Sequence, residues 1–109
     1  MLVISGDNIF VTKADDFSLH IEIIMQDGEI YEIQDTDKIT FKLFTKPKNE
    51  LNNPPIFQKD FDNKSKEVEI LSDDTKFLKG DKYYYVCKLY SNEYGKNTIL
   101  EGQLYFTYD

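Results

Sequence analysis

Apolar and polar residues alternate along most of this chain with the period of two that is typical of β-strands. Ile24 is the one apolar residue on the polar side of its segment. Residues 2–11 predict a bent edge strand, broken at Gly6-Asp7. The alternation predicts the other strands at residues 17–25, 38–46, 67–70, 80–90 and 98–108.

The most specific local pattern lies in residues 80–89. Asp81, Tyr85 and Cys87 have the D-x-x-x-Y-x-C spacing of one strand in immunoglobulin-like sandwiches. The tyrosine of that motif closes a corner, because its hydroxyl bonds to upstream backbone while its ring fills the core. We therefore expect Tyr85 to be buried and to form this corner. With the strand pattern, the spacing predicts an all-β fold, an immunoglobulin-like antiparallel β-sandwich of about seven or eight strands.

Glycine and proline mark the predicted interruptions between and within strands. Asp27-Gly28 predicts a tight turn. The segment 47–66 holds all three prolines and predicts a long crossover between sheets rather than a central strand. Gly102 lies within a predicted strand, where a residue without a side chain contributes no packing, and it predicts a β-bulge.

A single helical turn is predicted just before the strand at 80–90. Ser72 or Asp73 is suited to cap this turn, because a short polar side chain can accept a hydrogen bond from a free backbone amide. Phe77 or Leu78 is expected to close the bottom of the sandwich.

Length and charge restrict the classes of partner. A chain of 109 residues predicts one domain, residues 1–109. The 20 acidic residues outnumber the 13 basic ones, all of which are lysine, and the net charge is −7. Nucleic acids and anionic membranes bind basic surfaces, so we expect neither as a partner. The sequence also lacks an apolar run of about 20 residues and the pattern of a signal peptide, so we expect the mature protein to be soluble. Its single cysteine allows no intrachain disulfide, which suits folding in a reducing cytoplasm.

Residues suited to catalysis are few. His20 is the only histidine, and it lies on the polar side of its strand without a second imidazole or a nucleophilic serine in a motif. Cys87 is the only cysteine, which excludes an intrachain disulfide, and its inward position is typical of a thiol that acts as a small apolar side chain. We expect neither enzymatic activity nor a cofactor.

Two binding functions remain as alternatives. A carbohydrate-binding module could stack exposed tyrosines on sugar rings, although the chain has no tryptophan. A calcium-dependent adhesion module could use loop carboxylates, but none of the acidic segments matches the EF-hand loop, and turn formation or helix capping explains them more simply. These segments are Asp15-Asp16, Asp35 with Asp37, Asp60 with Asp62 and Asn63, and Asp73-Asp74.

Four segments, taken together, resemble a known structural family. They are Gly6-Asp7, residues 35–41, residues 70–89 and residues 98–106. The chain resembles the small immunoglobulin-like β-sandwich modules of tailed bacteriophages and prophages, including the N-terminal domain of the baseplate upper protein. The matching positions in the most specific part are Asp74, Thr75, Gly80, Tyr83, Tyr85, Thr98, Ile99 and Gly102.

The resemblance implies a non-enzymatic structural protein of a phage tail or baseplate. Such a protein acts through contacts with other phage structural subunits or with further copies of itself. It is expected in the bacterial cytoplasm during assembly and then in the virion.

Strand order predicts where such contacts are made. In an immunoglobulin-like sandwich the strands at 38–46, 80–90 and 98–108 share one sheet, so their outward residues form a continuous face. That face is unusually apolar for a solvated surface. The alternative is that residues 46–66 fold back over it, with Ile56, Phe57 and Phe61 as the cover. The predicted interface residues are Phe44, Tyr84, Val86, Tyr90, Ile99 and Tyr105.

Overall fold

The computed structural model describes residues 2–5, 8–13, 15–46 and 54–107 of the chain. No helix among them is long and apolar enough to cross a membrane. In chain order their elements are β1 (Leu2–Ser5), β2 (Asn8–Thr12), β3 (Phe17–His20), β4 (Lys38–Phe44), β5 (Phe57–Asp60), β6 (Glu67–Ile70), α1 (Ser72–Thr75), β7 (Lys82–Ser91) and β8 (Gly95–Thr107).

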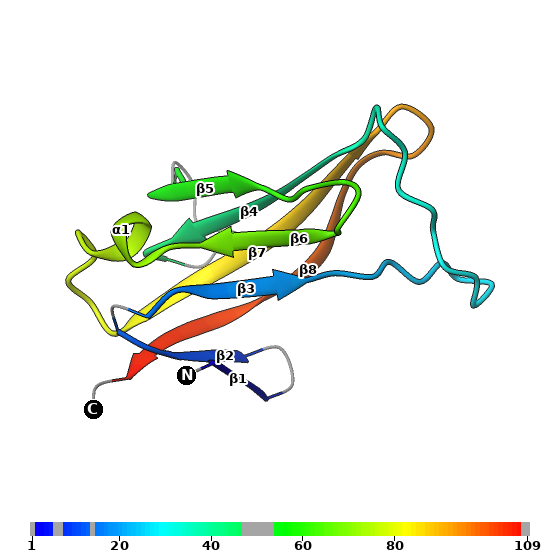
Figure 1. The fold of residues 1–109 in the computed structure, drawn as a ribbon. Helices are drawn as coiled ribbons and strands as arrows, with labels where there is room; N and C mark the ends of the chain where they lie inside the picture. The colour runs from blue at the N-terminus through cyan, green and yellow to red at the C-terminus, as the bar shows by residue number, and fades with distance from the viewer. Residues whose placement is uncertain (1, 6–7, 14, 47–53, 108–109) are drawn as a thin grey trace.

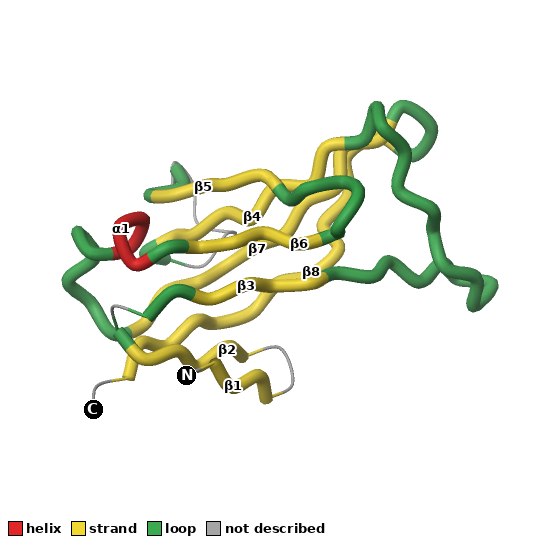
Figure 2. The backbone as a smooth tube through the Cα atoms, viewed as in Figure 1, coloured by secondary structure: helices red, strands yellow, loops and turns green. Residues whose placement is uncertain are grey.

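The strands form two layers (Figures 1 and 2). The larger layer is a six-stranded sheet in the order β1-β2-β8-β7-β4-β5, and the smaller is the pair β3-β6. β7 lies between β4 and β8 and is antiparallel to both. This arrangement confirms the predicted all-β sandwich. It is not antiparallel throughout, because β2 runs parallel to β8.

The alternation along the strands places one side of each in the core. In β4 the inward residues are Ile39, Phe41 and Leu43, each at most 1 % exposed, as the pattern predicts. They pack with the inward side chains of β7 and with those of the smaller sheet. The inward residues of these other strands are Tyr83, Tyr85, Cys87 and Leu89 in β7, Phe17 and Leu19 in β3, and Val68 and Ile70 in β6.

The first two predicted strands are corrected. β1 and β2 pair with each other in antiparallel register, so residues 2–5 and 8–12 form a hairpin rather than one bent strand. β3 ends at His20, whereas the pattern predicted a strand to residue 25. Ile21 N donates to Lys66 O at 2.9 Å, and beyond it the chain leaves the two-stranded sheet. Alternation continues past His20, but pairing with β6 does not.

The β-bulge of β8 lies at Ile99 and not at Gly102. Cys87 pairs with Leu100 and Lys88 with Thr98, so Ile99 is the extra residue between two ladder positions. Gly102 keeps a regular place in the ladder, opposite Tyr85. An extra residue exchanges the inward and outward positions for all residues after it in the strand. The bulge therefore changes which side chains of β8 face the core.

The predicted helical turn is present, but other residues cap it. Leu71 N donates to Asp74 Oδ2 at 2.9 Å, and Ser72 N donates to Asp16 Oδ1 at 2.6 Å from the loop before β3. The backbone hydrogen bond from Leu71 lowers the pKa of Asp74. Leu78 is buried and closes this end of the sandwich, whereas Phe77 is 54 % exposed.

Lys13, which no sequence pattern indicated, also holds the helical turn against the sheet. Its ammonium group donates to Leu78 O at 2.7 Å and to Thr75 O at 3.1 Å. It also lies 4.4 Å from the centroid of the Phe106 ring. The turn is therefore fixed at its C-terminal end by one charged side chain that donates to two carbonyls, of which Thr75 O also accepts from Leu78 N at 2.9 Å.

The corner tyrosine is Tyr83. Its hydroxyl accepts a hydrogen bond from Gly80 N at 2.7 Å, and its ring packs edge-on against Phe106. Tyr85 is buried as predicted, at 2 % exposed, but it lies one pleat farther along β7 and its ring stacks on Phe41. The upstream backbone bond that the sequence assigned to Tyr85 is thus made by Tyr83, at the start of β7.

Candidate interface on the outer face of the sheet

We call the side of the six-stranded sheet that points away from β3 and β6 the outer face. Residues that pair directly across strands share a side, so the even-numbered residues of β4 and β7 lie there. Before the bulge β8 adds Lys96 and Thr98, and after it Glu101, Gln103 and Tyr105. β2 adds Phe10, which pairs with Tyr105.

Three of the six predicted interface residues lie half-buried on this face. They are Tyr84, Tyr90 and Tyr105. Phe44 and Val86 lie on the same face but are only 7 % and 2 % exposed, so they offer little surface for a partner.

Ile99 is not on the outer face. It is partly buried against the core and lines a cleft together with Leu89, an inward residue of β7. The prediction for Ile99 is therefore wrong, because the bulge adds one residue and turns this side chain to the inner side. Phe10, in contrast, was missed by the sequence analysis. Its ring stacks on Tyr105 with centroids 5.0 Å apart and an interplanar angle of 10°.

The alternative, in which residues 46–66 fold back over the outer face, is also wrong for its covering residues Ile56, Phe57 and Phe61. Ile56 N donates to Leu43 O, and Phe57 pairs with Leu43, so this part of the crossover extends the sheet sideways as β5. Phe61 is buried in the core between the layers. Residues 47–53, which belong to the same predicted crossover, lie outside the described part of the chain.

Lysines surround the tyrosines of the outer face. The ammonium group of Lys42 donates to Tyr90 Oη at 2.8 Å, and this hydrogen bond lowers the pKa of Tyr90. Lys82 Nζ lies 5.5 Å from the ring centroid of Tyr84 and 5.9 Å from that of Tyr105. A cation near the face of an aromatic ring is attracted by the ring's electrons. The outer face thus combines flat aromatic surface with positive charge, although the whole chain is acidic.

A second surface feature lies at one end of the sandwich. We call residues 21–35, between β3 and β4, the arm; it projects beyond the strands in Figure 1, where it is drawn in cyan. Tyr31 N donates to Ile23 O and Met25 N donates to Glu29 O, both at 2.8 Å, so the arm is a small hairpin. Its turn is at Asp27-Gly28, as predicted, where Gly28 has a φ of 87°.

The base of the arm is fixed by a buried carboxylate. Asp37, 6 % exposed, accepts a hydrogen bond of 2.5 Å from the Tyr31 hydroxyl and one of 2.9 Å from Gln34 N. Burial, followed by the bond to Asp37, raises the pKa of Tyr31. Asn63 donates from the turn before β6 to the carbonyl of Asp37 at 2.7 Å. The arm is therefore held in one orientation at its base.

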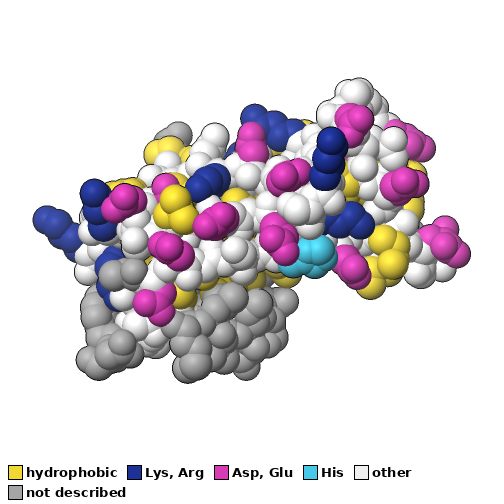
Figure 3. Space-filling model, in the orientation of Figure 1, with side chains coloured by type: hydrophobic (Ala, Val, Ile, Leu, Met, Phe, Trp, Pro, Cys, Tyr) yellow, Lys and Arg dark blue, Asp and Glu magenta, His cyan; other side chains and the backbone are white. Residues whose placement is uncertain are grey.

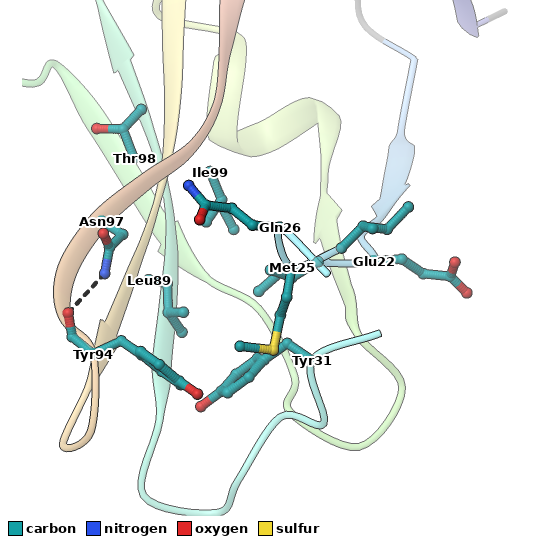
Figure 4. Close-up of a pocket in the computed structure, with 11 residues that line it drawn as sticks. Glu22, Met25, Gln26, Tyr31, Leu89, Tyr94, Asn97, Thr98 and Ile99 are labelled. Carbon is teal, nitrogen blue, oxygen red and sulfur yellow. Dashed lines mark hydrogen bonds between the residues drawn. The ribbon is translucent and has the colours of Figure 1, made fainter. Parts of the chain in front are cut away.

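The arm and the β7–β8 turn enclose a cleft of about 640 Å³ (Figure 4). Tyr31 and Tyr94 meet edge to face there, with centroids 5.7 Å apart, beside Met25, Leu89 and Ile99. Glu22 is the one carboxylate of the lining, and Figure 4 shows its side chain pointing away. The lining residues thus provide packing surface rather than a pair of groups for proton transfer.

The acidic segments have structural roles in the described residues. Asp60 accepts from the Thr40 hydroxyl at 2.9 Å, Asp62 accepts from Lys64 N at 2.9 Å, and Asp74 contacts Lys59 Nζ at 3.1 Å. No three His, Cys, Asp or Glu side chains in the described part of the chain are grouped so that they could hold a metal ion. Asp62 thus forms a turn and Asp74 caps a helical turn, as the simpler sequence interpretation states, whereas Asp60 bonds across two paired strands.

His20 and Cys87 are where the strand pattern puts them. His20 is exposed on β3, with Nδ1 3.9 Å from a Glu67 carboxylate oxygen. Cys87 is 1 % exposed, and burial raises the pKa of its thiol to about 12. A thiol with so high a pKa is not a nucleophile at neutral pH.

Comparisons with models of protein families, with curated proteins and with solved structures found no match for this chain.

Proposed function

We propose that this protein is a non-enzymatic structural subunit of a phage or prophage tail or baseplate, and that it docks to neighbouring subunits through the outer face. The observation that carries the proposal is that the half-buried rings of Phe10, Tyr84, Tyr90 and Tyr105 all lie on the outer face of the sheet. Tyrosine and phenylalanine are enriched in protein interfaces, where large rigid rings contribute contact area at little cost in side-chain entropy.

The lysines of this face favour the same function. Lys42, Lys82, Lys88 and Lys96 lie among the aromatic side chains of the outer face, so a docking partner would meet aromatic surface and positive charge together. The resemblance of the motifs to phage β-sandwich modules supplies the kind of partner, another virion subunit. Assembly functions need a docking surface and no catalytic group.

Incorporation into phage particles tests both halves of the proposal. Particles are purified from a host that expresses the wild-type chain or a Tyr84→Lys, Tyr105→Lys variant, and the chain is detected with an antibody. We expect the wild type in the particle fraction and the double variant in the free fraction, because two added charges disrupt an aromatic contact. A Leu71→Lys, Phe77→Lys variant is the control, since both residues are exposed elsewhere and the added charge is equal.

Two outcomes would contradict the proposal separately. Absence of the wild-type chain from purified particles would mean that it is not a virion subunit. Incorporation of the folded double variant at the wild-type level would mean that the outer face is not the docking surface. The far-ultraviolet circular dichroism of each variant shows whether it is folded.

A further inference from the structure

The arm carries an apolar surface that the fold does not use. Ile24 and Ile30 are 68 % and 57 % exposed, the largest exposed fractions among the large apolar side chains of the described residues. They pair across the arm in an antiparallel bridge, so both project from the same side of it. Ile23, Met25 and Tyr31 alternate with them and pack on the body of the protein. One side of the arm is thus anchored, and the other presents two adjacent isoleucines to solvent.

The charge of the arm is the opposite of that of the outer face. Residues 21–35 contain no lysine, and five of their side chains are exposed carboxylates: Glu22, Asp27, Glu29, Glu32 and Asp35. Figure 3 shows carboxylates gathered at the end of the molecule where the arm lies. On the outer face, the charged residues of β4, β5, β7 and β8 are five lysines and two carboxylates: Lys38, Lys42, Lys82, Lys88, Lys96, Asp60 and Glu101.

We propose that the arm of one copy docks on the outer face of a second copy, with Ile24 and Ile30 against the tyrosines and the carboxylates of the arm against the lysines. Each surface supplies what the other lacks, because one is apolar and acidic and the other is aromatic and basic. The fixed base of the arm, at Tyr31 and Asp37, means that little order has to be gained on binding. This inference rests on the proposed docking role of the outer face and names its occupant.

The two surfaces lie on different parts of one chain, so the contact is heterologous. Each docked copy still offers one free arm or one free face, and successive copies therefore form a ring, or a filament if the ring does not close. Opposite charges steer the copies together and are screened by salt, so the assembly is expected to weaken as ionic strength rises.

The test uses two complementary variants in sedimentation velocity at low salt. The arm variant is Ile24→Ser, Ile30→Ser, and the face variant is Lys82→Glu, Lys96→Glu. The wild type is expected to assemble beyond the dimer as its concentration rises. Each variant alone should bind its own kind roughly a hundredfold more weakly, because two apolar contacts or two charge pairs are lost. Mixed together, the two variants should form a 1:1 complex and nothing larger, because one intact arm and one intact face remain.

Matched controls separate these effects from general changes in charge or polarity. Leu71→Ser, Phe77→Ser removes two exposed apolar side chains elsewhere, and Lys64→Glu, Lys79→Glu makes the same charge change at exposed sites off the outer face. Both controls should assemble like the wild type.

Three results would overturn the inference. The first is a wild-type chain that stays monomeric at every concentration in sedimentation velocity. The proposed function would still be tested separately, by incorporation of the chain into phage particles. An arm variant that assembles like the wild type, beside a monomeric face variant, would leave the outer face as the docking surface and exclude the arm as its occupant. A mixture of the two variants that forms no complex would exclude a heterologous contact between arm and face.

Discussion

Tyr85→Ala is expected to lower the free energy of unfolding by about 3–5 kcal/mol, the cost of emptying a buried aromatic site. Tyr85 is 2 % exposed, and its ring stacks on Phe41 with centroids 5.9 Å apart. It belongs to β7, the strand between β4 and β8, so the cavity would open in the middle of the core. Urea denaturation measures the change as a shift in the midpoint concentration of urea, with the slope m of the unfolding free energy unchanged.

The control for this variant is Phe77→Ala. Phe77 is also aromatic but 54 % exposed, and its truncation should change the free energy of unfolding by about 0.5 kcal/mol or less. Equal losses for the two variants would contradict the account of the core. Tyr83→Phe should cost about 0.5–1.5 kcal/mol, since it removes only the hydrogen bond from Gly80 N.

Asp37→Ala is expected to lower the free energy of unfolding by about 2–4 kcal/mol. The substitution removes the acceptor of two hydrogen bonds, from the Tyr31 hydroxyl and from Gln34 N. A buried donor without a partner costs roughly 1–3 kcal/mol. Because both donors belong to the arm, the variant should also loosen its base, and a thermal melt together with proteolysis of the arm measures both effects.

Asp35→Ala is the matched control. Asp35 lies two residues earlier and is exposed, so its loss should change the free energy of unfolding by about 0.5 kcal/mol or less. If the two variants are equally stable and equally resistant to protease, Asp37 does not fix the arm.

The side of each residue in a regular strand could be predicted from the sequence. Ile39, Phe41 and Leu43 alternate without interruption, and their burial follows from the period of two alone. The same holds for Cys87, and for Leu104 in β8. The inward or outward side of these residues follows from their neighbours in the sequence, so the pairing partner of the strand need not be known.

Features that depend on distant pairing could not be predicted in this way. The bulge at Ile99 arises from the register of β8 on β7. The sequence pattern instead predicted the bulge at Gly102, three residues later. β3 ends at His20 because its partner β6 is short, although the alternation runs on into the arm. Tyr83 and Tyr85 share a side of β7, and only the position of Gly80 in space decides which hydroxyl it reaches.

The candidate interface was predicted in outline. Its tyrosines follow from alternation and strand order, whereas Phe10 joins them only because β2 runs parallel to β8. The exposed Ile24 is visible in the sequence as a break in the polar pattern. Its partner Ile30 becomes significant only when the hairpin sets the two side by side.

Hydroxyl-radical footprinting shows whether the outer face becomes buried when the chain assembles. The oxidation rates of Tyr84, Tyr90 and Tyr105 are compared between the free chain and the chain in assemblies or particles, with Phe77 as the internal reference. We expect the oxidation of the three tyrosines to fall on assembly while that of Phe77 stays constant. Unchanged oxidation of all three tyrosines in an assembled sample would contradict this expectation, because the docking surface would then lie elsewhere on the molecule.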